Sequence, residues 1–536
     1  MNLPIINRLK KQFNNNEILK NYLSVIILLT YCYFWISIGK YVEINFNEFL
    51  NNESIYLING LIYLIIFSAC LSILIIKLII NRKLPILSIL IIYPVASSIG
   101  YFQNINFHQN FNFLIHFFFT ISTLFIFFSI LEDHKDKKKL FKYFFKISSI
   151  FISLVFIIMV FPDLVSRIKN DIHVRDTHFV TLNLFFIDYI YTQNSNGASR
   201  IAILLFIFFF TKLIFKIKKN KKYKKYLFLN ILLSIIIFYY QSRLAIIFIV
   251  IYVLLWILTF SNKSFFLKII FFVSIIFIPF IFQNIYNTHL DKKIQIPKEL
   301  KKQKEMKIAW DNWDKGFTKA DGTIVAPKTG TAPRPPMLVN NPGEARKYFE
   351  QKKKQNLSIF KNNRFLGTNF KFTGDKFHAA GSSVKCRVAI NYKIFEIADI
   401  YSSGRICGWE ILLRDIDKKD IIFGKGFFYD QKFLNKYEKI SSNSYMNIIY
   451  NSGLFGFFPF LFIFIIVMSK YHVIYNLYKK SDYDDFLLFN LILFLLIRSF
   501  FEDTFAFVSI DLILFLTCSG ILSSKIKEFQ NNKKLK

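Results

Sequence analysis

The chain has 536 residues, 54% of them hydrophobic, and its apolar residues gather in long uncharged runs. Such runs match the ~20 residues that cross a bilayer core as a helix, which excludes an ordinary soluble domain. The net charge of +34 would suggest nucleic acid in a soluble protein. Much of the Lys and Arg stands in short loops between apolar runs, where it sets membrane orientation, so we expect no nucleic-acid partner.

The N-terminal residues Met1 to Lys20 are basic, and an apolar run follows from about 22 to 38. This run is too long for the hydrophobic region of a cleavable signal and lacks a small-x-small cleavage site. We therefore expect it to remain as the first membrane span.

Twelve apolar segments predict membrane helices, because backbone polar groups in lipid must pair within their own segment. The segments cover about 21–39, 56–80, 84–101, 111–131, 143–162, 200–217, 227–241, 244–260, 265–285, 452–470, 485–500 and 506–523. The sequence therefore predicts an all-α polytopic membrane protein with about twelve transmembrane helices.

Orientation follows from the basic loops, because Lys and Arg in short loops favour the cytoplasmic side. With twelve spans, all the basic segments fall on one side: the N-terminus, 81–83, 132–142, 216–225 and 525–536. The intervening loops 43–54 and 102–110 carry neither Lys nor Arg. The prediction is a multi-pass protein of the bacterial inner membrane with both termini in the cytoplasm.

Three regions follow from this topology. Residues 1–285 form an N-terminal membrane region of nine helices, 286–451 a large periplasmic loop, and 452–536 three more helices with a cytoplasmic tail. The lysines of the large loop do not contradict the orientation, because long loops translocate regardless of charge. Its segment 310–341 matches no pattern with a known role.

The five cysteines divide by location. Cys32, Cys70 and Cys518 lie in apolar runs and are expected to be small core residues. Cys386 and Cys407 lie in the large loop, where an extracytoplasmic location would permit a disulfide; their spacing leaves that pairing open. No metal-binding spacing is present.

Three arginines stand at the predicted outer ends of spans: Arg200, Arg243 and Arg498. Charge at a membrane boundary is costly and often marks a substrate path or an ion pair. The planar guanidinium binds phosphate through two hydrogen bonds at once. The alternative is that each arginine extends to lipid headgroups, but their location on one side favours an outward-facing anion site.

Two further patterns lie in the second half. Arg405 and Trp409 are four residues apart and would share a helix face, either as a cation beside an aromatic surface for a substrate or as a cation–π pair that holds the loop. Gly424-Lys425-Gly426 predicts a tight turn, since a dinucleotide fingerprint needs a third glycine and a strand–helix context. Gly453 and Gly456 open a span, where small residues permit close helix packing.

The ordered set of motifs resembles the O-antigen polymerase and ligase family over roughly residues 190–500. The motifs are Asn196 to Arg200, Ser242-Arg243, Ser403-Gly404-Arg405 with Trp409, Gly424-Lys425-Gly426, Asn443-Ser444-Tyr445 and Gly453 to Gly456. Ligases of this family carry a His just before the outer-loop Asn, and this chain has Ser442 there. The resemblance therefore favours a polymerase, and a ligase that transfers the glycan to lipid A core or protein is the first alternative.

The resemblance implies a metal-independent glycosyltransferase without cofactor. Its donor would be a glycan on polyprenyl diphosphate and its acceptor a lipid-linked repeat unit, with membrane lipid, a chain-length regulator and a flippase as partners. It implies catalytic roles for Arg405, Arg243 and Arg200. Substrate binding would fall to Trp409, Asn443 and Tyr445 of these motifs and to Arg498, as a further cation for the diphosphate.

Two questions stay open at this level. Glu410, Asp415 and Glu502 are candidates for a base that assists the acceptor hydroxyl, but each also fits an ion pair, and none is assigned. The alternative from another class is a lipid-linked-glycan flippase or another polytopic transporter. Such a protein would carry charges deep in several spans, whereas most charges here stand at span ends or in loops.

Overall fold

The computed structural model describes most of the two membrane regions and little of the segment between them. The described residues are 17–39, 53–81, 84–104, 111–132, 137–170, 178–184, 187–193, 195–219, 221–259, 265–290, 317–318, 324–325, 409, 412–413, 415–430, 443–470, 482–502, 505 and 509–534. The chain divides into two compact units, one of residues 1–280 with 377–536 and the other of residues 281–376. Within the second unit the structure describes the end of α13 and one short strand pair, β3(Phe317–Thr318) and β4(Ile324–Val325).

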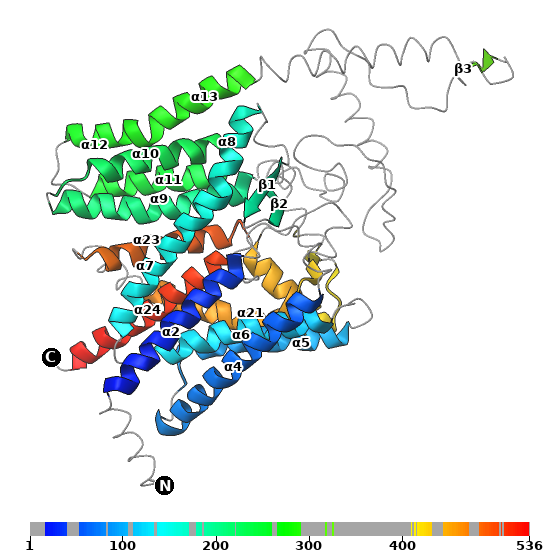
Figure 1. The fold of residues 1–536 in the computed structure, drawn as a ribbon. Helices are drawn as coiled ribbons and strands as arrows, with labels where there is room; N and C mark the ends of the chain where they lie inside the picture. Colours follow the sequence, from blue (N-terminus) through cyan, green and yellow to red (C-terminus); the bar gives the residue numbers. More distant parts are fainter. Residues whose placement is uncertain are drawn as a thin grey trace, which may run out of the picture. The chain divides into compact units, whose positions relative to one another are not determined.

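Helices dominate the first unit (Figure 1). In chain order they are α2(Glu17–Gly39), α4(Glu53–Asn81), η1(Ile86–Ile91), α5(Ile92–Gln103), α6(Phe111–Leu131), α7(Lys137–Val155), η3(Phe156–Val160), α8(Phe161–Lys169), α9(Ser195–Lys218), α10(Lys224–Tyr239), α11(Arg243–Thr259), α12(Phe265–Phe272), η4(Val273–Phe277), α13(Ile278–Leu290), α19(Asp420–Phe423), α21(Ser444–Ser469), α23(Tyr483–Ser499) and α24(Ile510–Lys534).

Each of the twelve predicted segments contains a described helix. Seven stretches in the described part of the chain are long and apolar enough to cross a membrane: Leu57–Ile79, Ile86–Gln103, Phe111–Leu131, Lys137–Lys169, Gly197–Ile217, Ile269–Tyr286 and Ser444–Ser469. Shorter apolar stretches occur in α2 and α11. The protein is therefore a helical membrane protein. The count of twelve crossings and the large periplasmic loop stay predictions.

A short antiparallel hairpin was not predicted from the sequence. Strands β1(His178–Leu184) and β2(Ile187–Gln193) pair from His178 opposite Gln193 to Leu184 opposite Ile187. Both strands carry the β-branched and aromatic residues that favour extended chain, and they lie between the predicted spans 143–162 and 200–217. The hairpin immediately precedes α9.

Helices of the first unit pack against their neighbours in sequence and also against helices far away in the chain. Helices α9 and α10 lie side by side, with α11 beside them, and α4 packs along α6 (Figure 1). Helix α21 packs against α5, more than three hundred residues earlier, and α23 packs against both α9 and α24. The C-terminal membrane region is thus integrated with the N-terminal one.

One buried tyrosine joins three of these helices. The hydroxyl of Tyr31 on α2 is hydrogen-bonded to Ser148 of α7 at 2.8 Å and to Thr517 of α24 at 3.1 Å. Its ring stacks on Phe144 with centroids 4.0 Å apart. Because Tyr31 is 0% exposed, both hydroxyl partners replace water, as a buried polar group requires.

Candidate functional site

The turn Gly424-Lys425-Gly426 is wedged between α5 and a kink in α21. Gly424 has φ +70° and Gly453, at the kink, has φ +64°, in the left-handed region that favours glycine. A Cβ on Gly453 would lie 2.3 Å from the Ile422 carbonyl oxygen. The amides of Lys425 and Gly426 donate to the Tyr450 and Asn451 carbonyls, each at 2.9 Å. The predicted tight turn is present, and its glycines permit backbone-to-backbone contact.

This turn carries the Lys425 cluster, which we define as Lys425, Asp415, Asp420, Tyr450 and Asn104. The Lys425 ammonium lies 3.1 Å from Asp415 Oδ2 and 3.3 Å from Asp420 Oδ2. The Tyr450 hydroxyl donates to Asp415, and the Asn104 amide donates to Asp420 at 3.3 Å. The Lys425 side chain is 8% exposed, and the side chains of Asp420 and Asp415 are 0% and 24% exposed. Lys425 therefore neutralises carboxylates that hold the turn.

The charge state of Lys425 follows from two opposing effects. Burial disfavours the ammonium form, but the hydrogen bonds and negative charges of Asp415 and Asp420 outweigh that effect and raise the pKa of Lys425 above its ordinary value. The nearby Tyr429 phenol also has a raised pKa, mainly because burial disfavours the phenolate. Lys425 is thus a fixed positive charge at physiological pH.

The start of α21 is anchored to the chain that follows α23. The Asn443 carboxamide caps α21 by accepting from the Met446 amide at 3.0 Å and donates to the Phe500 carbonyl at 2.9 Å. The Ser444 hydroxyl donates to the Glu502 carbonyl at 2.8 Å. These contacts give Asn443, which the sequence analysis assigned to substrate, a structural role that its polar N-cap position explains.

Arg498, near the end of α23, belongs to the Arg498 cluster of Arg498, Asp511, Arg200 and Tyr445. The Arg498 Nε donates to Asp511 Oδ2 at 3.0 Å, with both side chains buried. The Tyr445 hydroxyl accepts a hydrogen bond at 3.0 Å from Ser499, the residue after Arg498. Arg498 is thus an ion-pair partner inside the protein, one of the two roles that the sequence allowed.

Arg200 brings a second guanidinium to this cluster. It lies in the first turns of α9, and its charge acts on Arg498 closely enough to oppose that residue's own positive charge. The Arg200 Nε is buried and has no hydrogen-bond partner in the described part of the chain. A buried donor without a partner is costly. Arg200 therefore lies within electrostatic range of Arg498, with one of its own guanidinium N–H groups still to be satisfied.

Sequence reasoning missed another buried arginine. Arg167 on α8 is 0% exposed, and its Nε lies 3.0 Å from both carboxylate oxygens of Asp163. The Tyr240 hydroxyl donates to the same carboxylate at 2.7 Å. The signal was present, since Asp163 and Arg167 are four residues apart and so share a helix face. Tyr240 lies just before the turn to Arg243.

Three buried asparagines at the start of α21, one of them its N-cap Asn443, were also missed as a group. Asn443, Asn447 and Asn451 recur every four residues, which places them on one helix face. The Asn451 amide donates to Asp430 at 2.9 Å. Asn447 is 0% exposed, and neither polar atom of its carboxamide has a hydrogen-bond partner within the described chain. The Asn-x-x-x-Asn spacing could have identified this polar face.

The remaining predicted residues are only partly placed. Arg243 begins α11, and its side chain lies outside the described residues. Arg405 and Glu410 lie outside them as well, as do Cys386 and Cys407. Trp409 is half-buried, and its indole nitrogen is buried without a hydrogen-bond partner in the part of the chain described. The predicted pairing of Arg405 with Trp409 therefore stays a prediction.

Three other expectations concern metal binding, the cysteines and the candidate base Asp415. No group of three or more His, Cys, Asp or Glu that could hold a metal ion occurs among the described residues, and metal independence stays a prediction. Of the described cysteines, Cys518 is buried and Cys32 and Cys70 are half-buried, all as free thiols. Asp415, a candidate base, accepts from Lys425 and Tyr450, so those two donors engage its carboxylate.

Comparisons with known proteins add no relative. Neither the protein-family models, nor the curated proteins, nor the solved structures compared with this chain match it. The sequence and the geometry above are therefore the basis for any assignment of function.

Proposed function

We propose that this protein is a polymerase that extends a glycan carried on polyprenyl diphosphate, at the outer face of a bacterial inner membrane. The observation that carries the proposal is the buried Arg200 Nε, which has no hydrogen-bond partner in the described chain. A diphosphate oxygen beside Arg200 would accept from this N–H, and charge-assisted hydrogen bonds of this kind are the strong ones.

The chemistry is a displacement at the anomeric carbon of the donor's reducing-end sugar. A hydroxyl of the lipid-linked repeat unit forms the new glycosidic bond, and the bond to the polyprenyl diphosphate breaks. The hydroxyl proton is released, and the negative charge develops on the departing diphosphate. Fixed cations at that position stabilise the transition state more than the ground state. Arg200 is the described residue best suited to this role, with Arg243 and Arg405 proposed beside it.

The asparagine face of α21 supports a sugar-binding role nearby. The buried Asn447 carboxamide could donate to and accept from sugar hydroxyls, and its lack of a partner is costly until such a group arrives. Asp415 is engaged by Lys425 and Tyr450, so we assign no catalytic base.

The test replaces Arg200 in the cell that makes the glycan. With Arg200→Ala, we expect glycans of one or a few repeat units, because the leaving diphosphate loses a cation; the loss of one such group typically costs ~10²-fold or more in rate. Arg200→Lys should restore part of the chain length, since it keeps the charge without the planar fork. Glycan length is read on a gel, and lipid-linked precursor is assayed on each face of the membrane.

A matched control is Lys219→Ala, at an exposed lysine just after the opposite end of α9, which should leave the length pattern unchanged. Full-length glycans with Arg200→Ala would refute the polymerase site. Precursor accumulating on the cytoplasmic face would instead favour the flippase alternative. Long lipid-linked glycan that never reaches lipid A core or protein would favour the ligase.

A further inference from the structure

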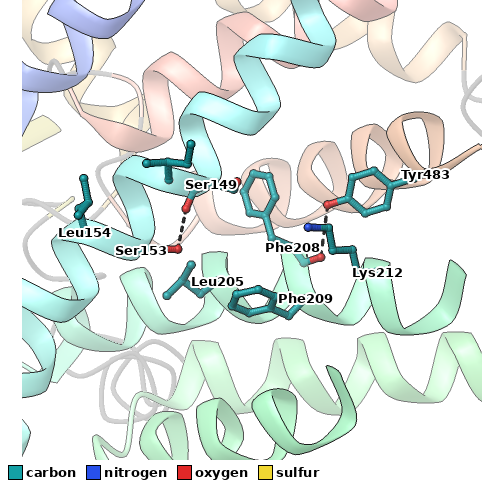
Figure 2. A pocket seen from close by; sticks show the side chains of 9 residues that line it. Ser149, Ser153, Leu154, Leu205, Phe208, Phe209, Lys212 and Tyr483 are labelled. Carbon is teal, nitrogen blue, oxygen red and sulfur yellow. Dashed lines mark hydrogen bonds between the residues drawn. The ribbon is translucent and has the colours of Figure 1, made fainter. Parts of the chain in front are cut away.

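A cavity of about 230 Å³ lies between three helices of the first unit (Figure 2). Helix α7 contributes Ser149, Ile150, Ser153 and Leu154, helix α9 contributes Leu205, Phe208, Phe209 and Lys212, and helix α23 contributes Tyr483. The cavity is smaller than the ~300–1,000 Å³ typical of sites for whole drug-sized ligands. Its apolar lining therefore suits a segment of hydrocarbon chain rather than an entire sugar.

Lys212 is the single cation in this lining. It precedes Lys218, the last residue of α9, by six residues, so it stands about 9 Å before the helix end. Its side chain is exposed although it lies within the apolar stretch Gly197–Ile217. An exposed ammonium at this depth is costly in hydrocarbon unless an anion or water reaches it.

The protein itself supplies aromatic faces to Lys212 but no carboxylate. The Lys212 ammonium lies 6.0 Å from the ring centroids of Tyr226 and Tyr483, and no ion pair of Lys212 occurs among the described residues. Of the acids that flank Tyr483, Asp485 pairs with Lys525, and the charge of Lys142 acts on Asp484. The positive charge of Lys212 is thus left for a group from outside the protein.

Three hydroxyl-bearing residues also line the cavity: Ser149, Ser153 and Tyr483. The Ser153 hydroxyl donates to the Ser149 carbonyl at 2.7 Å, and the Tyr483 hydroxyl lies 3.5 Å from the Phe208 carbonyl (Figure 2). In Figure 2 the Lys212 ammonium lies close to the Tyr483 hydroxyl. The lining therefore combines apolar side chains, among them Leu154, Leu205 and Phe209, with hydroxyl groups and one cation.

We propose that this cavity binds one anionic glycerophospholipid, with its phosphate at Lys212 and Tyr483 and part of an acyl chain along the apolar lining. The proposal rests on the protein being embedded in a membrane and is independent of the glycan chemistry proposed above. Further lysines follow in sequence at the same end of α9: Lys216, Lys218, Lys219, Lys221, Lys222, Lys224 and Lys225. Basic pockets between membrane helices at such an end recognise anionic headgroups.

The test measures lipid binding to the purified full-length chain in a neutral detergent after removal of co-purified lipid. Native mass spectrometry and the thermal unfolding midpoint are followed with added phosphatidylglycerol, phosphatidylcholine or inorganic phosphate. We expect one phosphatidylglycerol to be retained preferentially and to raise the midpoint. Lys212→Leu should weaken that preference about fivefold, the effect of one lysine charge near an anionic lipid surface.

Two variants make the result specific. Lys219→Leu removes a lysine seven residues further along, outside the cavity lining, and should keep the preference. Ser153→Phe fills the cavity while keeping Lys212, and should release the lipid although the charge is intact. Size-exclusion profiles identify any variant that has unfolded, and for such a variant Lys212→Gln or Ser153→Leu is measured instead.

Three outcomes would overturn the proposal. Phosphatidylcholine could bind as tightly as phosphatidylglycerol, or Lys212→Leu could keep the full preference. Inorganic phosphate could raise the midpoint as much as the lipid, which would indicate an anion site without an acyl chain. Unchanged binding in Ser153→Phe would likewise place the lipid outside this cavity.

Discussion

Buried charges in the described chain are held by opposite charges from nearby in the sequence. Lys425 contacts Asp415 and Asp420, Arg498 contacts Asp511, and Arg167 contacts Asp163. Replacing one partner of a buried pair leaves the other charged and desolvated, which costs more than the pair contributes. Substitutions at such residues therefore affect folding as well as any activity.

Lys425→Met tests the effect on folding at the Gly424-Lys425-Gly426 turn, which is hydrogen-bonded to α21. The change leaves the buried Asp420 carboxylate without its cation, and we expect a loss of stability of about 3 kcal/mol, typical of a broken buried pair. Lys418→Met and Lys419→Met are matched controls, because both lysines are exposed in the same segment. Thermal unfolding in detergent measures the difference, and equal midpoints for Lys425→Met and the controls would refute the structural role of the cluster.

The raised pKa of Lys425 adds a pH dependence to the same experiment. A group whose pKa is higher in the folded state stabilises the fold fully below its unfolded pKa, about 10.4 for lysine. That contribution is lost as the pH rises through the higher folded value. We therefore expect the stability gap between wild type and Lys425→Met to stay constant from about pH 7 to 9 and to shrink above about pH 10.5. A gap that narrows below pH 9 would contradict this assignment.

At the residue level the sequence identified cations better than their partners. Arg200 and Arg498 stand out because each is a charge beside an apolar run, a local signal. The bond from Asn104 to Asp420 joins residues 316 positions apart, and no periodicity encodes such a separation. Asp163 and Arg167 could have been found from their spacing, but their distance from the family motifs kept them out of the prediction.

Helix α21 is the element in which the site residues converge. Its first turn contacts the chain after α23, its second and third turns carry Tyr450 and Asn451, and its kink at Gly453 receives the 422–426 turn. The kink has a specific cause, because the non-helical φ of Gly453 leaves room for the backbone of Ile422. The geometry of this helix start therefore depends on one residue without a side chain.

Gly453→Ala should disrupt this arrangement. The added Cβ would meet Ile422 backbone atoms at 2.3 Å and impose a side chain at φ +64°, with an expected loss of about 3 kcal/mol or more. Gly520→Ala is the control within a helix, since its Cβ would meet the Phe141 ring at 3.4 Å and Leu87 Cδ1 at 3.9 Å, which are ordinary contact distances; there we expect no loss or a gain of up to ~1 kcal/mol. Tryptophan fluorescence during heating measures both, and equal midpoints would show that the kink tolerates a side chain.

The order of elements was predictable because apolar length is a strong local signal. All twelve predicted segments contain a described helix, and the turn at Gly424 to Gly426 is where the sequence places it. Hairpin β1–β2 and helix α8 were not predicted, since they lie in a segment without a long apolar run. The packing of α5 against α21 was also beyond reach, because it depends on contacts between regions far apart in the chain.

At the scale of the whole molecule, the number of crossings depends on helices of marginal length. Helices α10, α11 and α23 have 16, 17 and 17 residues, near the lower limit of ~17 for a spanning helix. Tilt and lipid thinning accommodate such lengths at modest cost. The proposed orientation therefore rests on the basic loops, which all fall on one side of the membrane when there are twelve crossings.

Reporter fusions test that orientation directly. Alkaline phosphatase, which is active outside the cytoplasm, should be active when fused after Lys353 and inactive after Lys222. Green fluorescent protein should fluoresce after Lys222 and after Lys536. The expected pattern follows from the excess of Lys in the 216–225 loop. Active phosphatase after Lys222 would place the Arg200 end of α9 on the cytoplasmic side and remove the basis of the proposed reaction. Inactive phosphatase after Lys353 would contradict the predicted periplasmic loop.

The Tyr31 hydroxyl has a consequence for biosynthesis. Its two partners, Ser148 and Thr517, lie 117 and 486 residues further along the chain, so they leave the ribosome much later than Tyr31 itself. Until α24 is translated, α2 has only one of its two polar partners in place. The anchoring of α2 is thus completed by a segment synthesised 486 residues later, and a ribosome that stops before α24 releases a product in which α2 is still incompletely anchored.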